Sequence, residues 1–418
     1  MEKLIKFLDN SYTCFHAIIN LEKELINAGF IKLDESKKWN IEPEKNYYII
    51  RNTSSIIAIK IPSNIKDVGF NIVASHSDSP CYKLKPNATI NDVRNNYTKL
   101  NTEGYGGMIA TTWLDRPLGI AGRVFVEKND EIKEELITLE ETLVIPNVAI
   151  HLSKDQTLNP QIDMLPLLGE ANNLFESVLS KYVDGKVLSN DLFLYNKEKA
   201  MLSGLNNEYL MSGRLDDLEC AYTSVEALIK SNPSNIAVCA VFNNEEVGST
   251  SANGADSQFL VDTLNRIADA LSFDIYQALA SSFIISADNA HAVHPNHPEK
   301  SDSTNMVYMN KGVVVKHQAS LRYTTDALSE AIFKKICNLI DVPYQDYTNR
   351  SDMRGGSTLG AISQSHLSIP SVDIGLAQLA MHSIYETCGV KDIEYMVKVL
   401  NKFYDIKLKK NNNKIEIL

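Results

Sequence analysis

The sequence predicts an α/β protein that carries a second, β-rich unit inserted in the chain. After Met211, apolar strand-like runs alternate with segments of helical periodicity, which is typical of a layered α/β sheet. Between about Lys85 and Asn206, short β-rich runs alternate with turn residues instead, which indicates a separate unit. A chain of 418 residues is also long enough to bury two hydrophobic cores.

The opening of the chain predicts helices followed by strands. Apolar residues from Lys3 to Leu25 recur with helical spacing, and the spacing is interrupted near Asn10 and Ser11. Three strand-like runs follow, YYIIR, SSIIAIKI and VGFNIVAS. Within the inserted unit, GRVFVEK and ETLVIPNVAIHL are β-rich.

The segment after Met211 predicts alternating helices and strands. The expected helices are DDLECAYTSVEALIKS, DSQFLVDTLNRIADALSF, DALSEAIFKKICNLIDV and KDIEYMVKVLNKFYDI. The expected strands are SNIAVCAVF, SSFIISA and SIPSVDIGL. Two of the helices carry apolar stripes, formed by Leu218, Tyr222, Val225 and Leu228 and by Leu328, Ile332, Phe333 and Ile336. We expect these stripes to face the core, and we assign them no chemistry.

Composition excludes several classes of protein. A net charge of −11, from 41 basic and 52 acidic residues, argues against nucleic acid or an anionic membrane as the main partner. The six cysteines are scattered without a C-x-x-C pair, so we expect buried free thiols in a reducing cytosol. The N-terminal MEKLIKFLDNSYT lacks the apolar core of a signal peptide, and no run reaches the ~18 to 20 apolar residues that span a bilayer. These features predict a soluble, cytoplasmic protein.

Four predicted strands are followed by a carboxylate or an imidazole just past their C-terminal ends. VGFNIVAS leads to His76, SNIAVCAVF leads to Glu245 and Glu246, SSFIISA leads to Asp288, and SIPSVDIGL is followed closely by His382. In open α/β sheets, ligand sites form at this edge. The sequence therefore predicts that these side chains meet at one edge of the sheet.

The residue types at this edge suit a pair of metal ions. Histidines and carboxylates without a thiolate fit two zinc ions, or manganese or cobalt. A paired site also needs a bridging carboxylate. A further acid cluster, Asp216 and Asp217 in GRLDD, opens a predicted helix and adds to the supply of carboxylates. Glu245 then remains as a candidate base beside Glu246.

Each of these residues also has an ordinary interpretation. His76 or His382 alone is typical of a satisfied histidine at the end of a strand. Asp216 alone would cap the helix that follows it, and a Glu pair is usually solvated. His294 and His297 in HAVHPNHP have metal-like spacing, but we expect them in a loop and not as ligands. The metal site is predicted only because several groups converge.

Over nearly its whole length, the sequence resembles the aspartyl aminopeptidase family of dinuclear zinc metallopeptidases. The stretches that carry the resemblance are LDNSYTCFHAI, ASHSDSP, TTWLDRPLGIAGRV, IPNVAIHL, SGRLDDL, NNEEVGS, SADNAHAVHPN, KGVVVKHQASLRYTTDA, RSDMRGGSTLG and LAMHSIYE. The sequence departs from the family at Asn243 and Asn244, where an Asp usually precedes the Glu pair, and in HSDSP, where HTDSP is common. The loop between Asn296 and Met309 is shorter than in many relatives.

The resemblance implies a role for each candidate residue. His76 and Asp288 would hold one metal, Glu246 and His382 the other, and Asp216 would bridge the two. Asp78 would orient His76 from behind, and Glu245 would be the general base. His151 would reach the reacting carbonyl from the inserted domain of a neighbouring subunit. His291, Lys316 and Tyr323 would contact the substrate, with Lys316 facing an acidic first side chain.

The resemblance also implies the architecture and the activity. It implies a mixed-sheet α/β/α catalytic domain, residues 1–88 and 206–418, interrupted by a β-rich dimerisation domain, residues 89–205. Two divalent ions per subunit, zinc or else cobalt or manganese, would support removal of N-terminal residues, preferentially Asp or Glu, from peptides with a free N-terminus. Self-association into dimers and a dodecamer is implied, without nucleic acid or membrane partners.

Three alternatives remain open from the sequence. The first is an aminopeptidase of broad or neutral specificity with the same mechanism. The second is a related dinuclear carboxypeptidase or deacylase. The third is a non-catalytic scaffold, which should have lost ligands or the base. Lys316, which closes the run GVVVK, also has an ordinary interpretation as a solvated strand-end lysine.

Overall fold

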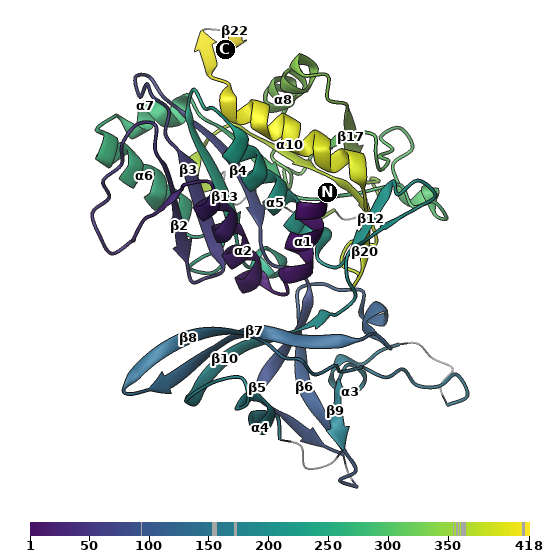
Figure 1. Cartoon of the computed structure of the whole chain (residues 1–418). Coiled ribbons are helices and arrows are strands. Elements are labelled where there is room, and N and C mark those ends of the chain that lie inside the picture. The colour runs from purple at the N-terminus through teal and green to yellow at the C-terminus, as the bar shows by residue number, and fades with distance from the viewer. Residues whose placement is uncertain are drawn as a thin grey trace.

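The computed structural model describes residues 1–92, 94–152, 157–170, 174–353, 355–356, 358, 360, 365–411 and 414–418. They form an α/β unit and, below it in Figure 1, a separate β-rich unit. In this part of the chain, no helix is both long enough and apolar enough to cross a membrane. The mixed α/β class predicted from the sequence is confirmed.

A nine-stranded mixed sheet forms the centre of the α/β unit, in the order β1-β2-β3-β13-β4-β14-β18-β16-β17. Its strands are β1 (Ile31–Lys32), β2 (Asn46–Arg51), β3 (Ser55–Lys60), β4 (Phe70–His76), β13 (Ile236–Phe242), β14 (Phe283–Ala287), β16 (Val313–His317), β17 (Tyr344–Thr348) and β18 (Ser371–Gly375). The four central strands, β13, β4, β14 and β18, run parallel. Their neighbours β3 and β16 run antiparallel to them. Every strand predicted outside the inserted unit therefore belongs to this sheet.

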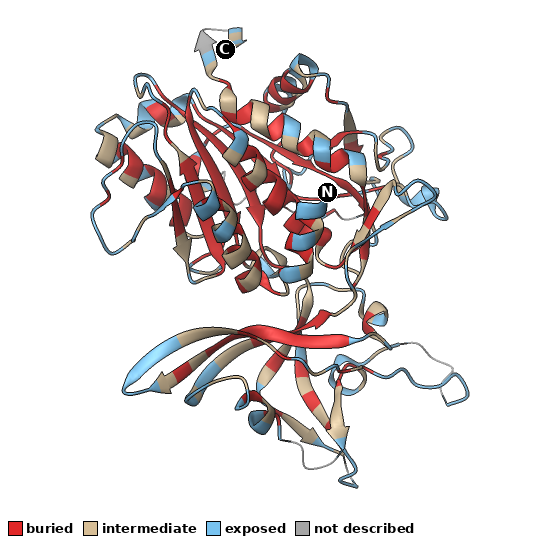
Figure 2. Cartoon of the chain, in the orientation of Figure 1, coloured by how far each residue is buried: buried red, intermediate tan, exposed pale blue. Residues whose placement is uncertain are grey.

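Helices cover both faces of the central sheet. One face packs on α1 (Glu2–Asn10), α2 (Cys14–Asn27), α5 (Leu215–Lys230), α8 (Ala327–Leu339) and α10 (Val390–Asp405). The other packs on α6 (Phe259–Leu271) and α7 (Ile275–Ala280). Val73 faces the first core and Ile72 the second, so β4 is apolar throughout because both of its faces are buried, as Figure 2 shows for the sheet interior.

The predicted helices are confirmed, with one error in an apolar stripe. The interruption predicted near Asn10 and Ser11 separates α1 from α2. The stripe of α5 is buried as expected. In α8, however, Leu328 is 36% exposed, because it lies in the first turn of the helix, before the part that packs on the core.

The β-rich unit is a six-stranded antiparallel sheet in the order β8-β7-β10-β5-β6-β9. Its strands are β5 (Cys81–Asn91), β6 (Tyr97–Tyr105), β7 (Leu118–Lys128), β8 (Glu131–Thr138), β9 (Leu167–Glu170) and β10 (Lys186–Asn196). With the short helices η1 (Ala110–Trp113), α3 (Pro160–Asp163) and α4 (Phe175–Leu179), it encloses a core of its own. The expected domain boundary at residue 88 falls inside β5, which begins seven residues earlier at Cys81.

GRVFVEK lies in β7 as predicted, but the prediction for ETLVIPNVAIHL is wrong. Only Leu143, Val144 and Ile145 form isolated bridges, to Leu118, Leu167 and Leu114. Pro146 then follows, and residues 146–152 form no strand. Proline lacks the N–H that would continue the pairing, which is why the apolar run does not extend as a strand.

A smaller sheet brings distant segments of the α/β unit together. Its strands are β11 (Met201–Ser203), β12 (Tyr209–Ser212), β20 (Glu386–Gly389), β19 (Ala377–Leu379) and β15 (Ala290–His291). The remaining elements are η2 (Glu245–Val247), η3 (Pro298–Lys300) and the terminal hairpin of β21 (Leu408–Asn411) and β22 (Lys414–Ile417). The pairing of β15 with β19 places the chain after β14 beside the chain that leads to His382.

Candidate metal centre

Four parallel strands deliver the candidate ligands to one edge of the central sheet. His76 is the last residue of β4 and pairs in register with Phe242, the last residue of β13. Asp288 follows β14 directly, and its backbone N–H donates to the carbonyl of Ile374 in β18. The convergence predicted from the ends of the strands therefore occurs.

Asp216 lies between two pairs of side chains. Its Oδ1 is 3.5 Å from Nε2 of His76, and that nitrogen is 3.8 Å from Oδ1 of Asp288. Its Oδ2 is 3.5 Å from Nε2 of His382, and that nitrogen is 3.4 Å from Oε2 of Glu246. Each oxygen of one carboxylate thus faces a separate histidine and acid, which is the arrangement expected of a bridging ligand.

These groups fit divalent ions in spacing and in their lack of other partners. Ligand atoms about 2.0 Å from a tetrahedral zinc lie ~3.3 Å apart, close to the separations in the cluster. Oδ1 of Asp216 and Oε1 of Glu246 are buried without a hydrogen-bond partner among the described residues. A buried carboxylate oxygen without a partner is costly, and a bound cation would satisfy it.

The charge of the cluster also favours cations. Burial and the charge of Asp216 raise the pKa of Glu246. Burial alone would lower the pKa of His76, but the carboxylates of Asp217, Asp216 and Asp288 outweigh it and raise the pKa. In the absence of metal, Glu246 and His76 therefore favour their protonated forms. Binding of divalent ions would release these protons.

A cavity of about 310 Å³ opens over the cluster. The predicted residues that line it are His76, Asp216, Glu245, Glu246, Asp288, His291, Lys316, Tyr323 and His382. Burial, together with the surrounding acids, raises the pKa of Glu245 to about 7, a value that suits a group exchanging protons near neutral pH. Glu245 contacts the same space as the ligands and remains free to act on a bound molecule.

Asp78 lies behind His76, as the sequence analysis expected. Its Oδ1 is 3.4 Å from Nδ1 of His76, and its backbone carbonyl is 3.1 Å from the same nitrogen. A group behind the imidazole fixes the ring so that Nε2 points into the cluster. Asp78 is 3% exposed and does not border the cavity over the ligands.

His151 is not at this site. It is exposed in the segment after Ile145 of the β-rich unit and does not border the cavity. His294 and His297 are exposed in a loop, as expected for residues that are not ligands of this cluster. Of the matching stretch RSDMRGGSTLG, Arg354, Ser357 and Leu359 lie outside the described residues.

Two buried acids that the sequence analysis did not single out support the ligands. Oδ2 of Asp217 accepts from the backbone N–H of His76 at 3.2 Å. The carboxylate of Glu386 accepts from the N–H of Asp216 at 3.1 Å and from the N–H of His382 at 2.8 Å. The only signals in the sequence were adjacency to Asp216 and the spacing of four residues after His382, and neither shows that the side chain points inward.

Comparison with known proteins identifies the family. A family model described as aminopeptidase I zinc metalloprotease (M18) matches residues 7–404. The chain belongs to the M18 family of zinc metalloproteases. The probable M18 family aminopeptidase 2 of Clostridium novyi is 45% identical over 97% of this chain and 98% of its own length. The M18 chain described here is therefore an aminopeptidase of the zinc metalloprotease class.

Solved M18 structures share its fold. The structure of the Ape4 and Nbr1 complex contains a chain 35% identical, with a TM-score of 0.91 over 96% of this chain and 85% of that one. The S. cerevisiae mApe1 dodecamer is 25% identical, with a TM-score of 0.84 over 96% of this chain and 95% of that one. The resemblance inferred from the sequence motifs is confirmed.

Proposed function

We propose that this M18 aminopeptidase uses two metal ions, bridged by Asp216, to remove N-terminal acidic residues from peptides. The observation that carries the two-ion proposal is the position of the Asp216 carboxylate. One oxygen faces His76 and Asp288, and the other faces His382 and Glu246. The ligand assignments are His76 and Asp288 for one ion and Glu246 and His382 for the other, with zinc the expected metal and cobalt or manganese as alternatives.

In the proposed reaction, Glu245 transfers the proton, and His291 and Tyr323 contact the peptide. Bound zinc would supply Lewis acidity at the scissile carbonyl and to an attacking water. Glu245 takes a proton from that water and passes it to the leaving amine. Its position on the rim of the cavity and its pKa of about 7 support this role. His291 and Tyr323 border the same cavity and are proposed to contact the peptide.

The acidic preference is proposed from Lys316. Its side chain is only 2% exposed, so the interpretation as a solvated strand-end lysine is wrong. Nζ is 3.4 Å from Oδ2 of Asp288 and lies over the ring of Tyr323 at 5.2 Å. The charge borders the cavity and would attract an acidic side chain, but it also neutralises Asp288. A broad or neutral specificity therefore remains the second candidate.

The β-rich unit is proposed as a dimerisation domain, and the catalytic domain as residues 1–88 and 206–418. Large apolar side chains are exposed on that unit, including Ile132, Ile150, Leu152 and Ile162. Exposed apolar side chains of this kind provide surface that a partner subunit would cover. The mApe1 relative assembles as a dodecamer, and we propose dimers or larger assemblies in which His151 serves the site of a neighbouring subunit.

The six cysteines form no disulfide, which supports the proposal of a cytoplasmic location.

The proposal is tested with aminoacyl fluorogenic substrates of Asp, Glu, Leu, Lys and Ala, with zinc, cobalt or manganese added and then removed by chelator. We expect chelator-sensitive hydrolysis confined to Asp and Glu. Activity centred on Leu or Ala would reject the acidic pocket and keep the two-metal mechanism. Hydrolysis of none of these substrates would favour the carboxypeptidase, deacylase or scaffold alternatives.

Lys316→Met separates the two possible effects of the lysine charge. If Lys316 recognises the substrate, kcat/KM falls about 10- to 100-fold more for Asp substrates than for Leu substrates, because one buried ion pair is lost. If it acts on Asp288 alone, all substrates lose activity equally and zinc content falls. Steady-state kinetics with the panel, together with zinc analysis, distinguish the two.

A further inference from the structure

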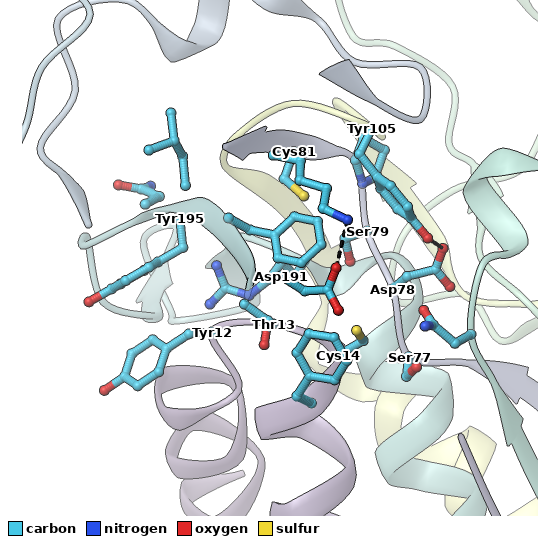
Figure 3. Close-up of a pocket in the computed structure, with 18 of the residues that line it drawn as sticks. Tyr12, Thr13, Cys14, Ser77, Asp78, Ser79, Cys81, Tyr105, Asp191 and Tyr195 are labelled. Carbon is cyan, nitrogen blue, oxygen red and sulfur yellow. Dashed lines mark hydrogen bonds and ion pairs between the residues drawn. The ribbon is translucent and has the colours of Figure 1, made fainter. Parts of the chain in front are cut away.

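Tyr105, the last residue of β6, connects the β-rich unit to the candidate metal centre. Its hydroxyl donates to Oδ2 of Asp78 at 2.7 Å, and Nδ2 of Asn244 donates to the hydroxyl oxygen at 2.9 Å. Figure 3 shows the Tyr105 hydroxyl directed at the Asp78 carboxylate. The amide donor leaves the single hydroxyl proton for the carboxylate, so the direction of the hydrogen bond is fixed.

The Asp78 carboxylate in turn contacts three residues of the metal centre, His76, Glu245 and Glu246. Oδ1 accepts from the backbone N–H of Glu245 at 3.2 Å and lies 3.4 Å from Nδ1 of His76. Oδ2, the oxygen that Tyr105 contacts, accepts from the backbone N–H of Glu246 at 3.2 Å. The position of one carboxylate therefore influences a ligand of each proposed ion and the proposed base.

The Asp78 carboxylate borders a cavity on one side. A cavity of about 190 Å³ lies between the two units, and Asp78, Tyr105 and Asn244 border it. Figure 3 shows this space, with Asp78 at its edge. Beside this space, the Asp78 carboxylate is held by the hydrogen bonds from Tyr105 and from the backbone N–H groups of Glu245 and Glu246. A hydrogen bond to a charged acceptor is the stronger kind.

The chain after Tyr105 also lies against the second proposed ion site. Gly106 has φ +73°, and a Cβ there would lie 3.0 Å from Cβ of Glu246. The N–H of Ile109 donates to the backbone carbonyl of His382 at 3.0 Å. The β-rich unit therefore contacts Glu246 and His382 through the segment that begins at Tyr105.

We propose that Tyr105 is a positioning residue, which holds Asp78 so that His76 and the Glu245–Glu246 turn keep the geometry needed to bind two ions. Tyr105 does not border the cavity over the ligands, so it acts through Asp78 and not on the peptide. Burial of the Tyr105 hydroxyl and the negative charge of Asp78 raise the pKa of Tyr105, which keeps this hydroxyl protonated as a donor. The inference rests on the proposed two-metal function.

The test is Tyr105→Phe in the full-length protein, with zinc affinity measured by competition against a chromogenic chelator. We expect zinc affinity to fall about 10- to 100-fold, the usual cost of losing a group behind a metal ligand. We expect kcat to fall by a similar factor while KM changes less than about twofold, because the substrate contacts remain. The melting temperature of the metal-free protein is measured alongside.

Tyr82→Phe is the matched control. Tyr82 lies in β5 of the same sheet, is 3% exposed and packs edge-on against Trp113 at 5.2 Å. Burial alone, without a hydrogen bond from a described residue, raises the pKa of its hydroxyl, so removal of this hydroxyl should leave zinc affinity and kcat unchanged. Equal zinc affinity in Tyr105→Phe, Tyr82→Phe and the wild type would overturn the inference.

A double-mutant cycle tests whether Tyr105 acts through Asp78. Adding Tyr105→Phe to Asp78→Asn should lower zinc affinity no further than Asp78→Asn alone. Additive losses would reject the pathway. If Tyr105→Phe does not fold, Asn244→Ala is measured instead, because it removes the amide that orients the Tyr105 hydroxyl. We expect Asn244→Ala to lower zinc affinity as well. Unchanged zinc affinity in this variant would reject the inference. A wild type that binds no zinc would reject the proposed function itself.

Discussion

The buried position of Asp216 decides between two interpretations that its sequence context allows. At the start of a helix it could have been a cap, but no side-chain cap hydrogen bond forms there, and its oxygens face His76 and His382. Glu246 was equally open to interpretation as a solvated acid, yet its side chain is only 5% exposed. In both cases burial next to imidazoles changes an ordinary acid into a candidate ligand.

Asp216→Asn should weaken binding of both ions, whereas His382→Gln should weaken only one. The reason is that each Asp216 oxygen faces a different pair of side chains, whereas His382 faces one. Zinc stoichiometry by elemental analysis after dialysis measures the difference. Retention of one tightly bound ion in Asp216→Asn would contradict a bridging role.

Glu245→Gln should keep the metals and lose about 10²- to 10⁴-fold in kcat, the usual contribution of a general base. The amide fits the same space but cannot take a proton. Zinc content and hydrolysis rate are measured on the same preparation. Loss of zinc in this variant would show that Glu245 is a ligand and reject its assignment as the base.

At the scale of elements, the central strands were the easiest part to predict. β4, β13 and β14 are parallel and buried on both faces, so each is a mainly apolar run that ends at or leads directly to a polar residue. The antiparallel unit was harder to predict, because half-buried strands and irregular segments have similar local composition. ETLVIPNVAIHL shows this, since its apolar residues pack on the core of the β-rich unit only up to Ile145.

One contact between α2 and β8 gives a pH-dependent stability. Nδ1 of His16 is 2.9 Å from Oγ1 of Thr13, and Nε2 is 3.2 Å from Oγ1 of Thr138 at the end of β8. Burial, with the charges of Arg214 and Lys23, lowers the pKa of His16 to about 4. The neutral ring therefore stabilises the junction above the unfolded-state pKa of about 6.5, and this stability is lost as the pH falls toward 4.

His16→Gln should remove that pH dependence. Between pH values near 7 and near 5, the wild type should lose about 1 to 2 kcal/mol more unfolding free energy than the variant. Urea denaturation of both proteins at each pH measures the difference, and the shared metal centre cancels. His294→Gln, in an exposed loop, is the matched control. An identical loss in wild type and His16→Gln would contradict the prediction.

At the scale of the whole molecule, we propose that the β-rich unit serves the active site in two ways. Through Tyr105 it contacts Asp78 of its own chain. His151 and its exposed neighbours Ile150 and Leu152 lie elsewhere on the unit, each of the two apolar side chains being 82% exposed. Because His151 does not border the cavity over the metal ligands of its own chain, it could reach a substrate only in the site of a neighbouring subunit.

Complementation between two inactive variants tests this arrangement. Co-expressed His151→Ala and Glu245→Gln chains form mixed dimers in which one site has its own Glu245 and the partner's intact histidine. If His151 acts across the interface, activity returns to about a quarter of the wild-type value, because half of the dimers are mixed and each has one complete site. Activity no higher than that of either variant alone would place His151 outside the reaction.

The sequence by itself determined the class of fold, the strand ends that carry His76, Glu246 and Asp288, and membership of the metallopeptidase family. These follow from local periodicity and from short motifs, which adjacent residues encode directly. Only the tertiary structure decided that Lys316 is buried against Asp288, that Glu386 holds the backbone of His382, and that Tyr105 reaches Asp78. These contacts join segments that local periodicity treats separately, and side-chain direction and burial at such contacts depend on how the elements pack in three dimensions, which no local pattern records.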